Sequence, residues 1–433
     1  MQDYRQQVID TLTDLVKMNT VEGEPKAGAP CGEGVREALD YTLALFDKWG
    51  FRTRDLDGYC GWAEVGEGKL FGVLCHLDTV PLGEGWKYGP LSATIADGKM
   101  YGRGTQDDKG PLVASMYALK SLLDEGKTPK MRVRFIFGCN EETGWQCMDR
   151  YLSTEEIPEI AISPDGDFPL INCEKGLGHF ELTVDCPDVI TRLEAGDRVN
   201  MVPDKATSIA TVCTEDMRAL ATKTGVRIEK NGDEYALTAT GKSAHGSTPW
   251  LGDNALLKVL SVLALADEDL AKLYAALREH TGAGLGIDLS DEVSGALSMN
   301  VGYAHVKGGK LYVGLDIREP ISTNNAEIAA KIKAALPEAQ VRLDKEHNAL
   351  YVAADHPFIV KLLAAYREVT GDMTPPLCVG GATYARALPC AVAFGPVFPG
   401  DEEMCHKVDE YVSLERLEQM HAIYRAAFEK ICF

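Results

Sequence analysis

The stretch that decides the fold runs from Leu70 to Gly110 and reads LFGVLCHLDTVPLGEGWKYGPLSATIADGKMYGRGTQDDKG. Its first residues, Leu70 to Cys75, form a short apolar run that is typical of a buried strand. His76 and Asp78 follow, and because alternate residues of an extended chain point the same way, their side chains share a face. A carboxylate beside an imidazole is the common second partner of a metal-bound histidine.

The same stretch ends with two adjacent acids, Asp107 and Asp108, at the start of a helix predicted from Pro111 onward. A phosphate-binding loop needs a glycine before its lysine, whereas here Lys109 precedes Gly110. Taken separately, the acids also fit a helix-capping turn, and the histidine–acid pair also fits a hydrogen-bonded loop. Together, at this spacing, the two pieces favour a site for a hard divalent metal.

Composition narrows the class of protein. A chain of 433 residues predicts two domains, and 45% hydrophobic with 25% charged residues is typical of a soluble globular protein. The formal charge of 44 − 65 = −21 argues against nucleic acid or an anionic membrane as partner. We expect no signal peptide, because the N-terminal residues lack a basic start and an unbroken apolar stretch, and no membrane-spanning segment, because no apolar run reaches that length.

Twelve cysteines are scattered without a CxxC pair. Several of them lie in or beside apolar runs, namely Cys75, Cys139, Cys173 and Cys390. We therefore expect free, mostly buried thiols in a reducing cytoplasm, although the spacing leaves a disulfide between two of them open.

Two further apolar runs end in acids. Val133 to Gly138 precedes Glu141 and Glu142, and Ile160 to Ser163 precedes Asp165. Because parallel strands bring their carboxyl ends to one edge of a sheet, this pattern predicts a parallel α/β sheet with a site at that edge.

The pattern changes near Lys175, where strands begin to alternate between apolar and polar residues. Such strands, separated by helices, predict an α+β module with an antiparallel sheet. Near Leu350 the buried pattern returns. We therefore expect a catalytic, metal-binding domain over residues 1–175 and 351–433, interrupted by a second domain over residues 176–350.

Five side chains of metal-ligand type each follow an apolar run in the first or last segment of the chain. Two imidazoles and three carboxylates suit two divalent ions that share one carboxylate. Individually, the Glu142 region also fits a solvated acidic pair, and His406 a surface histidine. The set comprises His76, Asp107, Glu142, Asp165 and His406.

The motifs HLDTVP, YGRGTQDDKGP, NEETG, SPDGDFP and HKVDEY occur in this order along the chain. With them, the chain resembles the co-catalytic zinc exopeptidases: aminoacylases, carboxypeptidase G, acetylornithine and succinyl-diaminopimelate deacylases, and most closely the PepV-type (Xaa-His dipeptidase or carnosinase-like) dipeptidases. The resemblance covers essentially the whole chain. It implies an α/β zinc-exopeptidase domain of phosphorylase/hydrolase-like type with a mostly parallel sheet, and an inserted α+β, ferredoxin-like lid domain.

The resemblance implies a set of protein ligands for two divalent ions. Zinc is the metal expected first, and Mn²⁺ or Co²⁺ are the alternatives. One ion would be held by His76 and Asp165, and the other by Glu142 and His406. Asp107 would bridge both ions and would be joined to the next residue by a cis peptide.

The resemblance also implies catalytic residues. Asp78 would orient the first metal-binding histidine, and Glu141 would be the general base toward the bridging water. From the lid, His245 in the sequence GKSAHGSTP would donate to the oxyanion of the scissile carbonyl. Asn200 would polarise the substrate from the same domain.

For the substrate's terminal carboxylate, the resemblance implies Arg318, because a guanidinium binds a carboxylate bidentately. Gly380, Gly381 and Ala382 would supply backbone contacts to the same group. Ala382 stands where relatives often have a third glycine.

The function expected from the resemblance is a metallopeptidase, specifically a dipeptidase acting on dipeptides with a free C-terminal carboxylate. The alternatives are an N-acyl-amino-acid deacylase and an inactive, peptide-binding relative. We expect a monomer, because a long insert can cover the site within one chain; a homodimer is the alternative.

Overall fold

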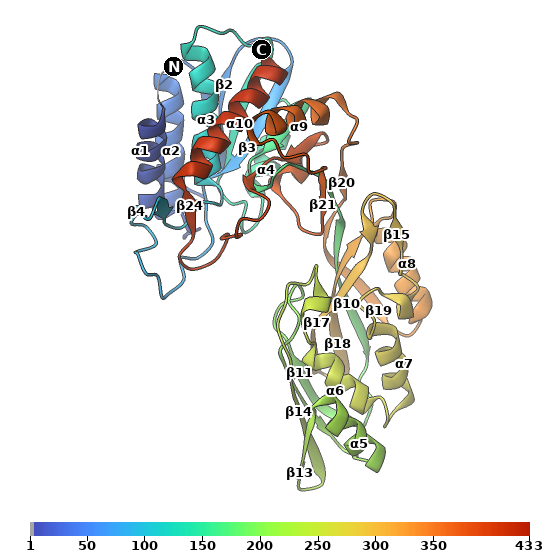
Figure 1. Cartoon of the computed structure of the whole chain (residues 1–433). Helices are drawn as coiled ribbons and strands as arrows, with labels where there is room; N and C mark the ends of the chain where they lie inside the picture. The colour runs from blue at the N-terminus through green and yellow to red at the C-terminus, as the bar shows by residue number, and fades with distance from the viewer. Residues whose placement is uncertain (1–3) are drawn as a thin grey trace. The chain divides into compact units, whose positions relative to one another are not determined.

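The computed structural model describes residues 4–433 of the chain and divides it into two compact units. The first unit comprises the chain up to Asn172, Val352–Leu377 and Thr383–Phe433, and the second comprises Cys173–Tyr351 and Cys378–Ala382 (Figure 1). Each unit has its own hydrophobic core.

The first unit is built on a mixed sheet with a parallel centre. The central strands, in spatial order, are β6 (Arg132–Gly138), β3 (Leu70–His76), β7 (Ile160–Ser163) and β22 (Ala391–Ala393), and they pair in parallel. The flanking strands pair antiparallel, with β1 (Arg52–Leu56) and β2 (Cys60–Val65) beyond β6 and β9 (Ile171–Glu174) beyond β22. The predicted parallel centre is confirmed, and its strands are buried on both faces as apolar runs of this kind require.

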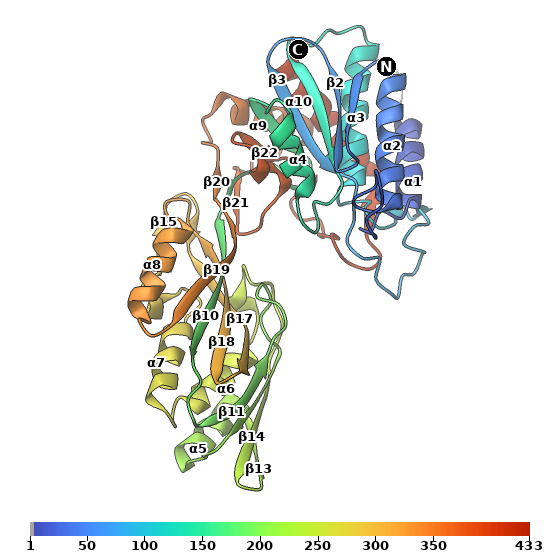
Figure 2. The same ribbon diagram turned by 180° about the vertical axis from the view of Figure 1, so that it is seen from behind.

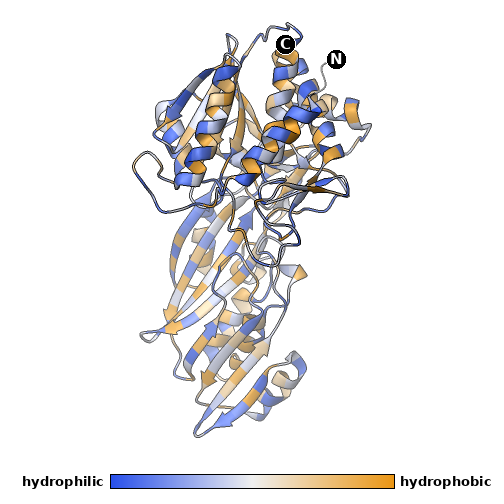
Figure 3. Ribbon diagram, turned by 90° about the vertical axis from the view of Figure 1, so that its left-hand side faces the viewer, coloured by the Kyte–Doolittle hydropathy of each residue, from blue (hydrophilic) through white to orange (hydrophobic). Residues whose placement is uncertain are grey.

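Within residues 4–433, this unit contains the α-helices α1 (Arg5–Lys17), α2 (Glu33–Lys48), α3 (Lys109–Asp124), α4 (Gln146–Thr154), α9 (Pro357–Thr370) and α10 (Leu414–Cys432). Helix α10 packs against both α3 and α9, and it lies behind β2 and β3 in the view from the back (Figure 2). Most of these helices carry apolar and polar residues side by side, as expected for helices buried on one side only, whereas α3 is buried along nearly its whole surface (Figure 3). Ser413 caps α10 by accepting a hydrogen bond from the backbone N–H of Arg416.

Three short strands pair beside the central sheet and hold the loops that carry Asp107 and His406. The hairpin β4 (Thr94–Ala96) and β5 (Lys99–Tyr101) pairs through β5 with β24 (Tyr411–Ser413). This pairing brings the chain before Asp107 beside the chain after His406. The remaining short elements of the unit are β8 (Gly166–Asp167), β23 (Pro396–Val397) and the 3-10 turn η3 (Tyr384–Ala387).

The second unit is an α+β unit with an eight-stranded, antiparallel sheet, as the alternating strands predicted. Helices α5 (Glu215–Thr224), α6 (Ala255–Leu263), α7 (Glu268–Leu277) and α8 (Asn325–Ala335) line this sheet (Figure 1). In spatial order the strands are β13 (Arg227–Asn231), β14 (Glu234–Thr240), β12 (Lys205–Ala210), β11 (Ile190–Ala195), β17 (Ser298–Lys307), β18 (Lys310–Glu319), β10 (Gly176–Asp185) and β19 (Gln340–His347). The short elements are η1 (Pro249–Leu251), η2 (Ala283–Leu285), β15 (Ser290–Asp291), β16 (Gly295–Ala296) and β20 (Leu350–Tyr351).

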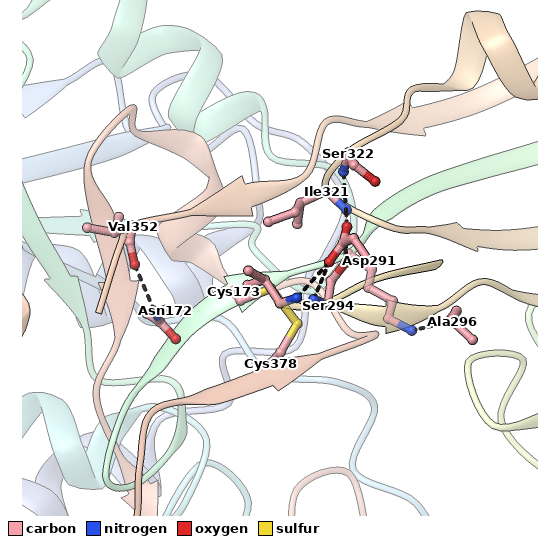
Figure 4. The surroundings of a disulfide bond; sticks show 11 residues. Asn172, Cys173, Asp291, Ser294, Ala296, Ile321, Ser322, Val352 and Cys378 are labelled. Atoms are coloured by element: carbon pink, nitrogen blue, oxygen red, sulfur yellow. Dashed lines mark hydrogen bonds between the residues drawn. A yellow bond between two sulfur atoms is a disulfide. The ribbon is translucent and has the colours of Figure 1, made fainter. Parts of the chain in front are cut away.

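A disulfide joins Cys173 on β9 to Cys378 on β21 (Leu377–Val379), with 4.4 Å between the two Cα atoms (Figure 4). The two strands pair, which places cysteines 205 residues apart in sequence next to each other. The expectation of free thiols is therefore wrong for these two cysteines. It is correct for the other ten, five of which are fully shielded from solvent.

Within residues 4–433, no helix is both long enough and apolar enough to cross a membrane.

Gly138, the last residue of β6, provides a test of the packing under the sheet edge. A Cβ atom at this position would lie 1.9 Å from Oη of the fully buried Tyr384. We expect Gly138→Ala to lower the free energy of unfolding by about 1–3 kcal/mol, because the ring must move in a packed core. Gly89→Ala is the control, since its Cβ would meet nothing closer than 3.7 Å. Equal urea midpoints for the two variants would contradict this packing.

Candidate active site

The candidate site begins at the end of β3 with His76, whose side chain is completely buried. Its Nδ1 lies 3.0 Å from the backbone oxygen of Asp78, and because a carbonyl can only accept, Nδ1 carries the proton. The ring nitrogen Nε2 lies 2.8 Å from Oδ1 of Asp107, and it is the nitrogen left to bind a metal ion once its own proton is lost. A histidine fixed in this tautomer by a carbonyl is prepared for metal ligation.

Asp107 lies between two histidines. Its Oδ1 is 2.8 Å from Nε2 of His76, and its Oδ2 is 3.1 Å from Nε2 of His406. The carboxylate thus presents one oxygen to each imidazole. Its peptide bond to Asp108 is cis, as the resemblance implied.

The loop that carries Asp107 is held by Glu410, a completely buried residue that the sequence analysis did not identify. Its Oε1 accepts from the backbone N–H groups of Gln106, at 2.9 Å, and Asp107, at 3.2 Å. Its Oε2 accepts from the N–H of Gly104, at 3.1 Å, and from Arg103, at 2.8 Å. The only sequence signal was its place in the HKVDEY motif.

Glu142 and Asp165 complete the acidic group around the two histidines. Oε2 of Glu142 lies 3.1 Å from Nε2 of His406, and Oδ2 of Asp165 lies 4.0 Å from Nε2 of His76. Glu142 follows β6 and Asp165 follows β7, so the carboxyl ends of the two strands that flank β3 deliver them. The five predicted ligands therefore come together in the first unit.

The pKa values reflect this crowding of charge. Burial and the neighbouring carboxylates raise the pKa of Asp165 to about 7. Hydrogen bonds to Asp107 and Glu142 raise the pKa of His406 to about 11. The pKa of Asp107 itself falls below its usual range, because its hydrogen bonds to the two histidines outweigh the effect of burial.

The donor set fits divalent cations. Ligand atoms of His76, Asp107 and Glu142 all lie within 4.8 Å of one another, and the same holds for His76, Glu141 and Asp165. Imidazole nitrogens and carboxylate oxygens are the ligands that zinc and related ions prefer.

Asp78 holds the loop of Glu141 and Glu142 as well as the first histidine. Its carboxylate accepts from the backbone N–H groups of Glu141, at 3.0 Å, and Glu142, at 3.1 Å. The prediction placed this carboxylate on the imidazole of His76, but it lies 3.5 Å from Nδ1, and the backbone oxygen of Asp78 is nearer. The difference arises because the carboxylate is turned toward two amide donors.

Glu141 itself lies partly exposed beside the ligands. Burial raises its pKa well above the ordinary value, and the nearby Asp165, Glu142 and Asp78 add to this effect while His76 opposes it. A carboxyl group with a raised pKa can accept a proton from water and later return it.

In the second unit, His245 lies in the loop between β14 and η1. Its Nδ1 accepts from the backbone N–H of Ser247 at 3.2 Å, so the ring proton of the neutral imidazole is on Nε2. The backbone N–H of Gly246 donates to the backbone oxygen of Asn200 at 2.7 Å. This bond holds Asn200 beside the loop of His245, the other residue predicted to act from the lid.

Arg318, near the end of β18, is buried and already paired. Its Nε and Nη2 donate to the two carboxylate oxygens of Asp316 at 2.8 and 2.9 Å, and its Nη1 donates to the backbone oxygen of Gly380 at 2.8 Å. Asp316 is completely buried and was not foreseen from sequence. The second unit thus brings Arg318 together with the glycine loop, which comprises Gly380, Gly381 and Ala382.

That glycine loop also lies beside the histidine loop. A Cβ added to Gly380 would meet Cβ of Ser247 at 3.2 Å, whereas one added to Gly381 would meet nothing within 4 Å. Ala382 is the last residue that the second unit takes from this segment. The roles of Gly380, Gly381 and Ala382 toward a substrate stay predictions.

A parallel-centred α/β sheet that gathers histidines and carboxylates at its carboxyl edge defines a metal-dependent hydrolase. The family model described as Peptidase family M20/M25/M40 matches residues 72–430. The chain belongs to this family and is a metallopeptidase, which confirms the resemblance drawn from the motifs.

The relatives extend over the whole chain. The Staphylococcus saprophyticus protein named "Putative dipeptidase SSP1012" is 35% identical over 100% of this chain and 98% of its own length. The Bacillus subtilis protein named "Putative dipeptidase YtjP" is 35% identical over 99% and 97%. Among solved structures, human carnosine dipeptidase 1 shares the fold, with a TM-score of 0.57 at 15% identity over 99% of this chain and 97% of that one.

The pKa shifts predict proton release when the site binds metal. At pH 7 the metal-free site holds protons on both histidines, since the pKa of His406 is about 11 and that of His76 is also raised. Metal binding requires neutral imidazoles and ionised carboxylates, so adding Zn²⁺ to metal-free protein should release at least two protons per chain, because Asp165, with a pKa of about 7, adds part of a third. Calorimetry in buffers of different ionisation enthalpy measures this number. His406→Ala should release about one proton fewer; a wild-type release near zero would contradict the assignment.

Proposed function

We propose that this metallopeptidase is a dipeptidase that cleaves dipeptides carrying a free C-terminal carboxylate. The observation that carries the proposal is Asp107, which presents one carboxylate oxygen toward each of two histidines. A carboxylate shared in this way is what a centre of two divalent ions requires. The names of the curated relatives supply the dipeptidase class.

The metal centre is proposed to hold two ions, with zinc first and Mn²⁺ or Co²⁺ as alternatives. Asp107 would be shared between the two ions. Bound divalent ions polarise a carbonyl and lower the pKa of water. The other ligands would be His76 and Asp165 on one side, and Glu142 and His406 on the other.

Glu141 is the proposed general base. Its carboxylate takes a proton from the attacking water and returns it to the amine that leaves. Asp78 supports this role because its carboxylate accepts hydrogen bonds from the backbone N–H groups of Glu141 and Glu142 and so holds this part of the loop. The raised pKa of Glu141 suits a group that must both accept and give up a proton.

The second unit is proposed to act as a lid, with the domains divided near residues 175 and 350. His245 would donate its Nε2 proton to the developing oxyanion, and the tautomer set by Ser247 places the proton on that nitrogen. Asn200, whose backbone is bonded to the same loop, would polarise the substrate carbonyl.

Arg318 is proposed to bind the substrate's terminal carboxylate. A guanidinium has five N–H donors, and the bonds to Asp316 and Gly380 use three of them. The remaining donors, on Nη1 and Nη2, can bind a carboxylate end-on. Gly380, Gly381 and Ala382 would line the same subsite.

We propose a monomer in the cytoplasm. Ten of the twelve cysteines are free thiols, which supports a reducing compartment, and the Cys173–Cys378 disulfide is the exception.

Glu141→Gln tests the general base. A neutral amide cannot take a proton from water, so we expect kcat for a dipeptide to fall about 10²–10⁴-fold. The variant should keep two ions per chain by metal analysis, while the matched variant Glu142→Gln should lose metal. Wild-type turnover in Glu141→Gln would assign the base to another group.

Arg318→Ala tests the carboxylate subsite. Losing a hydrogen bond to a charged group costs about 1.5–3 kcal/mol, so kcat/KM should fall about 10–200-fold for a dipeptide and far less for its C-terminal amide. Arg342→Ala is the control, because this arginine is exposed on β19 and also pairs with carboxylates.

The wild-type enzyme should also prefer the dipeptide to the amide and to N-acetylated amino acids. Equal cleavage of dipeptide and amide, or an unchanged preference in Arg318→Ala, would rule out the carboxylate subsite. Better cleavage of acetylated amino acids would favour the deacylase alternative.

A further inference from the structure

The general base proposed above needs its side chain held as well as its backbone. Asp78 fixes the backbone of Glu141 by accepting a hydrogen bond from its N–H group. The carboxylate accepts a hydrogen bond at Oε1 from the indole N–H of Trp145, at 3.2 Å. The donor comes from the same loop, four residues further along the chain.

Trp145 is in turn held by a buried residue from another part of the first unit. Its ring meets the ring of Tyr384 edge to face, with 5.5 Å between centroids and 89° between planes. Tyr384 is completely buried, and its hydroxyl lies 2.7 Å from Sγ of Cys147. The same tyrosine ring faces His76 at 6.4 Å. Tyr384 thus fixes the indole relative to the metal ligands.

The backbone of Trp145 is in a conformation that large residues avoid. Its φ is +64°, in the left-handed region, where glycine would be unstrained. The backbone N–H of Trp145 donates to the oxygen of Asn140 at 3.0 Å, which closes the loop around Glu141. Backbone strain of this kind persists where the surrounding structure requires it, and it concentrates at functional sites.

We propose that Trp145 is a positioning residue for Glu141, and this inference rests on Glu141 being the general base. The indole N–H holds one carboxylate oxygen, so that the side chain stays directed at the attacking water and the other oxygen is left to take the proton. The strained turn at residue 145 is what brings an indole to this position.

If Trp145 served packing alone, a phenylalanine at this position would leave kcat unchanged. Trp145→Phe keeps an aromatic ring against Tyr384 but has no N–H group, so it separates the two roles. We expect kcat to fall about 3- to 30-fold with KM changed less than about 2-fold, because the lost bond acts on the base and not on substrate binding. Metal content should match the wild type.

The chain offers a matched control. The indole N–H of Trp62 donates to Oε2 of Glu155 at 3.0 Å, in the same unit but on β2. Trp62→Phe removes the same type of bond and should leave kcat unchanged. A second variant, Trp145→Gly, removes the donor and accepts a φ of +64° without strain, and it should lose at least as much kcat as Trp145→Phe.

The decisive measurement is a double-mutant cycle. If Trp145 acts through Glu141, Trp145→Phe should cost nothing further in the Glu141→Gln background. An equal loss in both backgrounds, or an unchanged kcat in Trp145→Phe, would overturn the positioning role. Full activity of Glu141→Gln alone would instead overturn the general base, so the two failures are distinguishable.

Discussion

The structure of the first unit depends on the placement of one carboxylate, that of Asp107. Its two oxygens face two histidines that are 330 residues apart in the sequence. That arrangement is possible because Glu410 binds the loop of Asp107 through backbone amides and because β5 pairs with β24. The ends of the chain are thereby joined around the site, and the parallel strands supply the remaining acids.

Most of the first unit followed from the sequence because its signals are local. The apolar runs that became β3, β6 and β7 are buried strands, and each ends where a histidine or an acid was predicted. The partners of these side chains could not be predicted in the same way. Glu410 and Tyr384 lie hundreds of residues from the groups they hold, and a single sequence does not show which distant segments pair.

The second unit shows what residue type alone leaves out. The strand-end arginine was predicted to bind the substrate's carboxylate, and Arg318 also pairs with the buried Asp316, two residues earlier on the same strand. Alternate residues of a strand share a face, so this pair was readable from the sequence LDIREP. Recognition in such a subsite would depend on the direction of the remaining N–H groups more than on net charge.

The bond between Cys173 and Cys378 has a topological consequence. It closes a covalent ring that contains nearly all of the second unit together with α9 of the first. A protease that cut one exposed loop within this ring would therefore open the ring without releasing a fragment. Separation of the pieces would need either a second cut or a reductant, so nicked protein would run as one chain on a non-reducing gel and as two on a reducing one.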